Sequence, residues 1–376
     1  MLGSAALLKP ATLSSHTPIT TTIVFQKEIA QIFQRKCFQC HTENNLSMSL
    51  TTYSHARPWA VAIKEEILER RMPPWSAVSG YGHFANDMSL TSREVSLILA
   101  WADGGAPSGV LKADEDKPPV FVPPLHGWER GLPDAIVRVG AGHHVPANAR
   151  DEAVRFDVPT GLSESRWVRA LQLNPTDRRI LRYAAYYDAG TGRWLGTWTP
   201  TQQVSSLPGG VAFRLPARAT LTVELGYRGG DEAVSGAAEL GLYFSSERPP
   251  MPASPLAVTA AVVDIASKTV AQRVRAEMRL EAPTMAVALW PSLGAGARSA
   301  ELTAIHPDGA VEPLLWLKNY RPQWPSAYVF REPLRLPAGT RLVLTAYYDN
   351  DSGAPVPVRP RIDVSAFTPS PRAATP

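Results

Sequence analysis

The residues best suited to chemistry are Cys37, Cys40 and His41, which stand in the order Cys-Phe-Gln-Cys-His. Two thiols three positions apart can each form a thioether bond to one vinyl group of haem, and the adjacent imidazole can bind the iron. A structural zinc site would need four ligands, and the chain has no second cysteine pair. A thioredoxin-like pair would belong to an α/β pattern, whereas this pair follows a helical one. The spacing therefore predicts one covalent haem c, with Cys37 and Cys40 as anchors and His41 as proximal ligand.

A second axial ligand is expected on the other side of the iron, unless that side stays open. Met72 is the predicted distal ligand, because two prolines follow it directly and stiffen the loop that would present its sulfur. Met48 and Met88 are the alternative methionines, and His83 would give bis-histidine ligation.

Three helical patterns surround these residues. Apolar residues share one helical face over residues 25–33, which lead into the cysteines, and again over residues 59–67. The third pattern opens with Thr91 and Glu94 at the spacing of a capping box and ends at Gly104-Gly105. An amino-terminal helix, a haem motif, a methionine loop and a final helix predict a small all-α domain.

The composition indicates an ordered chain of two or three domains. Of the 376 residues, 44% are apolar and 19% are charged. The formal net charge is only +4 and no block of Lys and Arg stands out, so nucleic acid is not an expected partner. No apolar run reaches the length of a membrane span. The two cysteines belong to the haem motif, so no disulfide framework is expected.

Beyond residue 130 the apolar period changes from helical to two. Apolar and polar residues alternate over residues 221–227 and 274–280, as in half-buried strands. The sequence Arg-Leu-Pro-Ala at 214–217 recurs at 335–338, each time followed by a strand pattern that ends in tyrosine. The repeat predicts two tandem antiparallel β-sandwiches.

Composition shifts divide the chain into six parts. The first part lacks the basic start of a usual secretion leader. The predicted parts are a leader or disordered segment (1–21), a cytochrome c domain (22–110), a proline-rich linker (111–130), a first β-sandwich (131–248), a second β-sandwich (249–368) and a disordered tail (369–376).

Several short motifs carry a family resemblance, among them Arg71-Met72-Pro73-Pro74-Trp75, Gly104-Gly105-Ala106-Pro107, Leu242-Tyr243-Phe244 and Tyr348-Asp349-Asn350. Through them the chain resembles bacterial proteins that fuse a class I cytochrome c domain to a copper type II, ascorbate-dependent monooxygenase module. Peptidylglycine α-hydroxylating monooxygenase is a well-known relative of that module. The resemblance implies an all-α domain followed by two jelly-roll-like antiparallel sandwiches.

The copper ligands that the resemblance implies are missing. Their positions fall on Arg182-Tyr183, Gly226-Tyr227 and near Leu289-Trp290-Pro291, none of which contains histidine. After His144 the chain has one histidine, His306, whereas the family holds each copper largely with histidines. We therefore expect no copper in the β region.

Together these features predict a monohaem c-type cytochrome that carries single electrons, with the β region as a docking or binding platform, and they favour an electron-transfer protein over an enzyme without deciding between the two. The covalent haem motif implies a periplasmic or extracellular location, and a redox partner protein would dock on the β region. A copper-dependent monooxygenase with unrecognised ligands, to which His143, His144 and His306 could contribute, is one alternative. Haem-based gas binding or sensing is the other.

Overall fold

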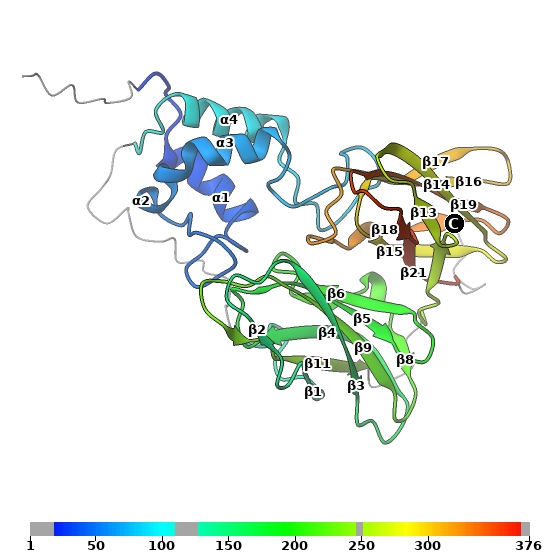
Figure 1. The fold of residues 1–376 in the computed structure, drawn as a ribbon. Helices are drawn as coiled ribbons and strands as arrows, with labels where there is room; N and C mark the ends of the chain where they lie inside the picture. The colour runs from blue at the N-terminus through cyan, green and yellow to red at the C-terminus, as the bar shows by residue number, and fades with distance from the viewer. Residues whose placement is uncertain (1–18, 110–126, 246–250, 370–376) are drawn as a thin grey trace, which may run out of the picture.

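The computed structural model describes residues 19–109, 127–245 and 251–369. The protein is mostly β, with 43% of its residues in strands and 13% in helices. Figure 1 shows the short helices, in blue and cyan, beside two groups of strands coloured green and yellow to red. Nearly all of the predicted leader (1–21), linker (111–130) and tail (369–376) lies outside the described residues.

Among the described residues, all of the α-helices lie in one amino-terminal stretch, here called the helical segment (residues 25–103). They pack around buried aromatic side chains, with the rings of Phe25 and Phe33 centred 6.0 and 6.2 Å from that of Trp101. The predicted capping box is confirmed, because Thr91 Oγ1 accepts the Glu94 N–H and Glu94 Oε2 accepts the Thr91 N–H. The helices are a π-helical turn η1 (Phe25–Ile29), α1 (Ala30–Lys36), α2 (Tyr53–Ala56), a 3-10 turn η2 (Arg57–Trp59), α3 (Ala60–Leu68) and α4 (Ser92–Asp103).

Two antiparallel sheets face each other in residues 135–245, here called the first sheet pair. One sheet has the strand order β1-β11-β4-β7, with β8 also paired to β4, and the other has the order β3-β9-β5-β6. The strands are β1 (Ala135–Val139), β2 (His144–Val145), β3 (Glu152–Pro159), β4 (Arg166–Pro175), β5 (Leu181–Asp188), β6 (Trp194–Trp198), β7 (Val204–Ser206), β8 (Phe213–Leu215), β9 (Thr220–Tyr227), β10 (Val234–Ser235) and β11 (Ala238–Ser245), and a 3-10 turn η3 (Pro208–Gly210) precedes β8.

Residues 256–367 form the second sheet pair. Its sheets have the orders β12-β21-β15-β18 and β14-β19-β16-β17, and a short ladder joins β13 to β20. The strands are β12 (Leu256–Thr259), β13 (Val263–Ile265), β14 (Thr269–Arg279), β15 (Thr284–Ser292), β16 (Ala297–Ile305), β17 (Val311–Lys318), β18 (Tyr328–Leu336), β19 (Arg341–Asn350), β20 (Val356–Val358) and β21 (Arg361–Phe367).

The two pairs repeat one strand order. Strands β3, β9, β5 and β6 of the first pair take the places that β14, β19, β16 and β17 take in the second. The recurring Arg-Leu-Pro-Ala sequences end β8 and β18 and lead into β9 and β19. In each pair, alternate side chains of the facing sheets fill one apolar core. A β-sandwich-like architecture in this part of the chain is therefore confirmed.

The segment after α3 leaves the helices and joins the second sheet pair. The Val78 N–H donates to Trp316 O over 2.8 Å, and the Lys318 N–H donates to Ser76 O over 2.9 Å. Further along, the Ala85 N–H donates to Val329 O over 2.7 Å. Residues 75–86 therefore run along β17 and β18 as additional backbone partners.

Side chains of the same segment enter the second core. Phe84 is 5% exposed, and its ring lies 5.2 Å from that of Tyr328 and 5.3 Å from that of Phe330. Trp75 packs against the same core, 4.8 Å from Tyr328. The chain between α3 and α4 thus belongs to the β part of the molecule.

The predicted fold class, an all-α class I cytochrome c domain followed by two tandem jelly-roll-like sandwiches, is wrong. Helices make up only 13% of the structure. Residues 75–86, which belong to the loop between α3 and α4, pair with strands of the second sheet pair and not with the helices. What the structure supports is a set of antiparallel sheets to which short helices are attached.

Among the residues that the structure describes, no helix is long and apolar enough to cross a membrane.

Replacing Phe84 should test whether residues 75–86 are part of the second core. Phe84→Ala removes a buried ring, so we expect the free energy of unfolding to fall by about 3–5 kcal/mol in urea titrations. Val311→Ala, at a position 64% exposed on β17, is the control and should change it by less than about 0.5 kcal/mol. Equal effects of the two substitutions would show that Phe84 contributes nothing to the core.

Candidate functional site

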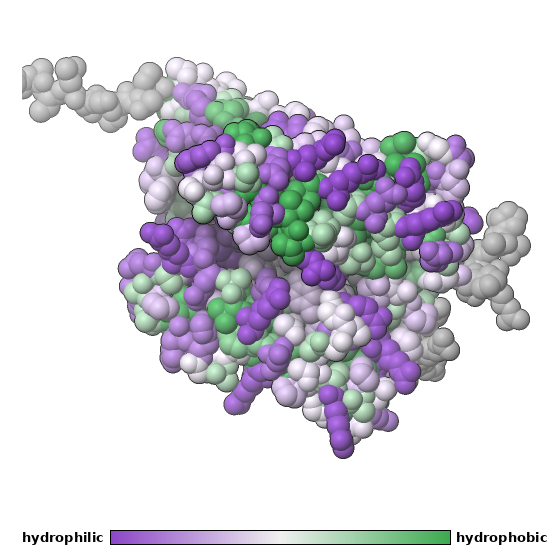
Figure 2. Space-filling model, turned by 45° about the vertical axis from the view of Figure 1, so that its right-hand side comes forward, coloured by the Kyte–Doolittle hydropathy of each residue, from purple (hydrophilic) through white to green (hydrophobic). Residues whose placement is uncertain are grey.

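A cavity of about 650 Å³ lies where the helical segment meets loops of both sheet pairs. This volume is in the range typical of small-molecule and cofactor sites. Figure 2 shows the surface hollowed between the upper and lower parts of the molecule, with hydrophilic side chains around the hollow. Cys37, Cys40, His41 and Met72 all line the cavity. The structure thus brings every predicted haem-binding residue to one place.

A helical turn places the three motif residues. The Cys37 N–H donates to Phe33 O over 2.8 Å, continuing α1, and the His41 N–H donates to Cys37 O over 2.9 Å. Residues three and four positions apart on such a turn lie on the same side. Both thiols and the imidazole can therefore reach the cavity together.

The His41 ring is held by one hydrogen bond. Its Nδ1 lies 3.1 Å from Met48 O, and because a carbonyl only accepts, Nδ1 carries the proton. Burial lowers the pKa of His41, so the ring is neutral and Nε2 keeps a free lone pair. This arrangement is typical of metal-binding histidines, whose other nitrogen donates to a carbonyl.

The two cysteines are half-buried. Burial raises the pKa of Cys37 to about 12, with Cys40 adding to the effect. Burial likewise raises the pKa of Cys40 to about 12, against a lowering by the charge of Arg182. Both cysteines are therefore neutral thiols near pH 7.

Met72 enters the cavity from the end of α3. The Arg71 and Met72 N–H groups both donate to Glu66 O, over 2.8 and 3.1 Å, which holds the chain against the last turn of the helix. Met48 also lines the cavity, but its carbonyl is the partner of His41. Met72 and Met48 are therefore the two methionines considered as distal ligand that line the cavity.

The other two alternatives lie elsewhere. Met88 lines a separate, much smaller cavity with Pro74 and Trp324. His83 belongs to the segment that runs along β18, where its carbonyl accepts the Arg331 N–H over 2.9 Å. Neither side chain lines the cavity with the cysteines.

The residues that the sheet pairs contribute to the cavity were not predicted from the sequence. Arg179, Arg182 and Arg228 come from the first sheet pair, and Arg321 and Trp324 come from the second. The Arg182 guanidinium lies over the Trp324 ring, 4.3 Å from its centre. No motif connects these positions, because they meet only through the packing of the three parts.

Each segment at which the resemblance implied copper ligands contains a buried aromatic side chain, namely Tyr183, Tyr227 or Trp290. The Tyr183 hydroxyl donates to Glu224 Oε1 over 2.9 Å, and its ring covers Gly226 so closely that a Cβ there would meet it at 2.0 Å. The Trp290 ring stacks on Trp194 with centres 5.9 Å apart and planes 9° apart.

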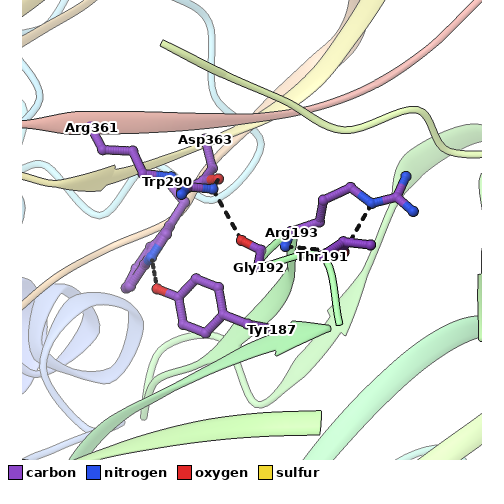
Figure 3. Close-up of polar contacts among 7 residues, drawn as sticks. All are labelled: Tyr187, Thr191, Gly192, Arg193, Trp290, Arg361 and Asp363. Atoms are coloured by element: carbon purple, nitrogen blue, oxygen red, sulfur yellow. Dashed lines mark hydrogen bonds and ion pairs between the residues drawn. The ribbon is translucent and has the colours of Figure 1, made fainter. Parts of the chain in front are cut away.

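Trp290 lies at the seam between the two sheet pairs. As Figure 3 shows, its Nε1 points to the Tyr187 hydroxyl and donates to it over 3.0 Å. Beside this contact, Arg361 of β21 donates to Gly192 O over 3.1 Å and to Asp363 Oδ2 over 2.9 Å. Burial raises the pKa of Asp363, and the paired Arg361 opposes this shift.

The histidines of the β region do not meet. His143 lies against Tyr227 in the first sheet pair, and His306 lies 3.0 Å from Glu312 in the second. His144 is exposed on β2. Among the described residues, no group of three or more His, Cys, Asp or Glu side chains could hold a metal ion.

Comparisons with known proteins do not assign the chain to a family. No family model matches the chain, and no curated protein matches it. Similar solved structures include PNGase F from Flavobacterium meningosepticum, at 11% identity over 63% of this chain and 97% of that one, with a TM-score of 0.27. Allantoicase from Saccharomyces cerevisiae matches at 12% identity over 57% of this chain and 77% of that one, with a TM-score of 0.21. Such TM-scores establish neither a shared fold nor a shared function.

The resemblance to a cytochrome c fused to a copper monooxygenase-like module is therefore wrong. No family model supports it, and the described residues are mostly β and contain no all-α cytochrome domain.

The seam between the sheet pairs yields a prediction. Tyr187→Phe leaves the indole N–H of Trp290 without its acceptor, and an unsatisfied buried donor costs about 1–3 kcal/mol. We expect the free energy of unfolding, measured in urea, to fall by that amount. Tyr347→Phe, at a half-buried position of β19 outside this seam, is the matched control. No difference between the two variants would contradict the role given to this hydrogen bond.

Proposed function

We propose that the chain binds one haem c covalently and carries single electrons. The observation that carries this proposal is the shared cavity, in which two thiols, a neutral imidazole with a free Nε2 and a thioether sulfur line one space. The donor set fits the group, because imidazole and thioether are the axial ligands of many c-type cytochromes.

Each residue would have a separate task. The Cys37 and Cys40 thiols would each add sulfur to one vinyl carbon and hydrogen to its neighbour, so that nothing is released and no oxidant is consumed. His41 would bind the iron through Nε2, while Met48 O keeps the ring in place. Met72, which follows α3, would supply the second protein ligand of the iron. A c-type haem, when bound, supplies one-electron exchange between Fe(III) and Fe(II).

The surroundings support electron transfer over substrate chemistry. Much of the cavity wall on the helical side is apolar, from Phe33, Leu50, Ile63, Ile67 and Ile98. Apolar walls limit the access of water to iron and so raise the reduction potential. The proposal includes no copper, a periplasmic or extracellular location and a redox partner protein of unknown identity.

Removing both thiols tests covalent attachment. In cells competent for cytochrome c maturation, the wild-type chain should give a band that stains for haem on a denaturing gel. Cys37→Ala with Cys40→Ala should abolish this band, because no thioether can form. An unstained wild-type band at the mass of the chain would refute the proposed function.

Removing the sulfur of residue 72 tests the axial ligand. Met72→Ala should abolish the weak long-wavelength band of the ferric spectrum and lower the reduction potential, because methionine ligation raises it. Met88→Ala, outside the cavity, is the matched control and should leave both unchanged.

Two other outcomes have distinct meanings. If Met48→Ala, and not Met72→Ala, abolishes the long-wavelength band of the ferric spectrum, Met48 is the distal ligand. A wild-type ferrous spectrum that changes on addition of carbon monoxide would indicate an open iron and favour gas binding over electron transfer.

A further inference from the structure

The charge of the cavity wall is unbalanced. Its basic side chains are Lys36, Arg179, Arg182, Arg228 and Arg321, and against them stands one carboxylate among the described lining residues, that of Glu66. Glu66 is itself bound to the Arg71 Nε over 2.9 Å. Such an excess of positive charge attracts an anionic group to the cavity.

Two of these basic side chains already have partners. Lys36 Nζ donates to Asp87 O over 3.1 Å. Arg179 forms a two-pronged pair with Asp177, with its Nη2 2.7 Å from Oδ2. Arg179 is thus neutralised by a carboxylate and Lys36 is held by a backbone carbonyl, which leaves Arg182, Arg228 and Arg321 as the other cations of the wall.

Arg182 is the most unusual of them. It is 8% exposed, and its Nε has no hydrogen-bond acceptor among the described residues. Its guanidinium forms one long ion pair, with 3.5 Å between Nη2 and Asp151 Oδ1, which leaves Nε unsatisfied. Because a guanidinium stays protonated, a buried N–H of this kind without an acceptor costs free energy. A ligand that accepts from Arg182 would remove this cost.

Arg321 lies on the same wall but comes from the second sheet pair. It is partly buried, and burial lowers its pKa, while the charge of Glu66 raises it. Among the described residues no carboxylate lies within ion-pair distance of it. Arg182 and Arg321 thus approach one cavity from two separate sheet pairs, with Trp324 beside them.

We propose that Arg182 and Arg321 bind the propionate carboxylates of the haem, so that both sheet pairs complete the haem site. This inference rests on the proposed function, which places a dicarboxylate in the same cavity. The helical side offers little to these carboxylates, because its wall is largely apolar and Lys36 is engaged. Arginine binds carboxylates with two parallel hydrogen bonds, which suits this task.

Porphyrin binding without covalent attachment tests the arginines directly. The full-length chain with Cys37→Ala and Cys40→Ala is titrated with protoporphyrin IX and with its dimethyl ester. Quenching of tryptophan fluorescence reports binding, since Trp59 and Trp324 line the cavity. We expect the free dicarboxylate to bind about tenfold more tightly than the ester, as a charge-assisted pair predicts.

The arginine variants are added to this background. Arg182→Gln and Arg321→Gln should each reduce the preference for the dicarboxylate several-fold. Arg179→Gln, which alters an arginine already paired with Asp177, is the matched control and should keep the preference. If Arg182→Gln fails to fold, the preference of Arg321→Gln for the dicarboxylate over the ester tests the inference by itself.

The haem-loaded chain gives a second readout. With both thiols restored, Arg182→Gln and Arg321→Gln should lower the reduction potential, because a removed positive charge no longer favours the reduced iron. Equal affinity for both porphyrins, or an unchanged preference in both variants, would overturn the inference. An unstained wild-type chain would instead overturn the proposed function, so the two failures are distinguishable.

Discussion

The cavity depends on the attachment of residues 75–86 to the second sheet pair. The backbone bonds between Val78 and Trp316 and between Ala85 and Val329 fix this segment along β17 and β18, and Phe84 fixes it in the core. Met72 lies a few residues before this attachment. Its position is therefore set at one end by the last turn of α3 and at the other by a β-sheet. A purely helical domain would lack the second of these supports.

Local features of the sequence were predictable where local chemistry decides them. Thr91 and Glu94 form the expected capping box because both partners lie within one helical turn. The strands over residues 221–227 and 274–280 follow from alternation of apolar and polar side chains, which one buried face requires. The repeat of Arg-Leu-Pro-Ala predicted two similar β units, and the structure has two sheet pairs, whose shared strand order the sequence did not predict.

The prediction was wrong where distant parts of the chain compete for one segment. Residues 75–86 contain no alternation that would mark a strand, yet they pair with β17 and β18 because Trp75 and Phe84 find an apolar core there. The motif residues Cys37 and His41 could be placed from spacing alone. Arg182 and Arg321 could not, because they reach the cavity only through the docking of both sheet pairs. The sequence thus predicted the residues of the candidate site on its helical side but not those that the sheet pairs contribute.

The shared cavity also has a consequence for the order of folding. Cys37 and Cys40 lie near the beginning of the chain, whereas Trp324 and Arg321 are added after almost all of both sheet pairs. Contacts of such long sequence separation form late, after the local turns and helices. During synthesis the two thiols therefore pass through a period in which the helical turn exists but the opposite wall does not. Under the proposed function, haem and the proteins that attach it would have open access to the thiols in this period, before the sheet pairs complete the cavity.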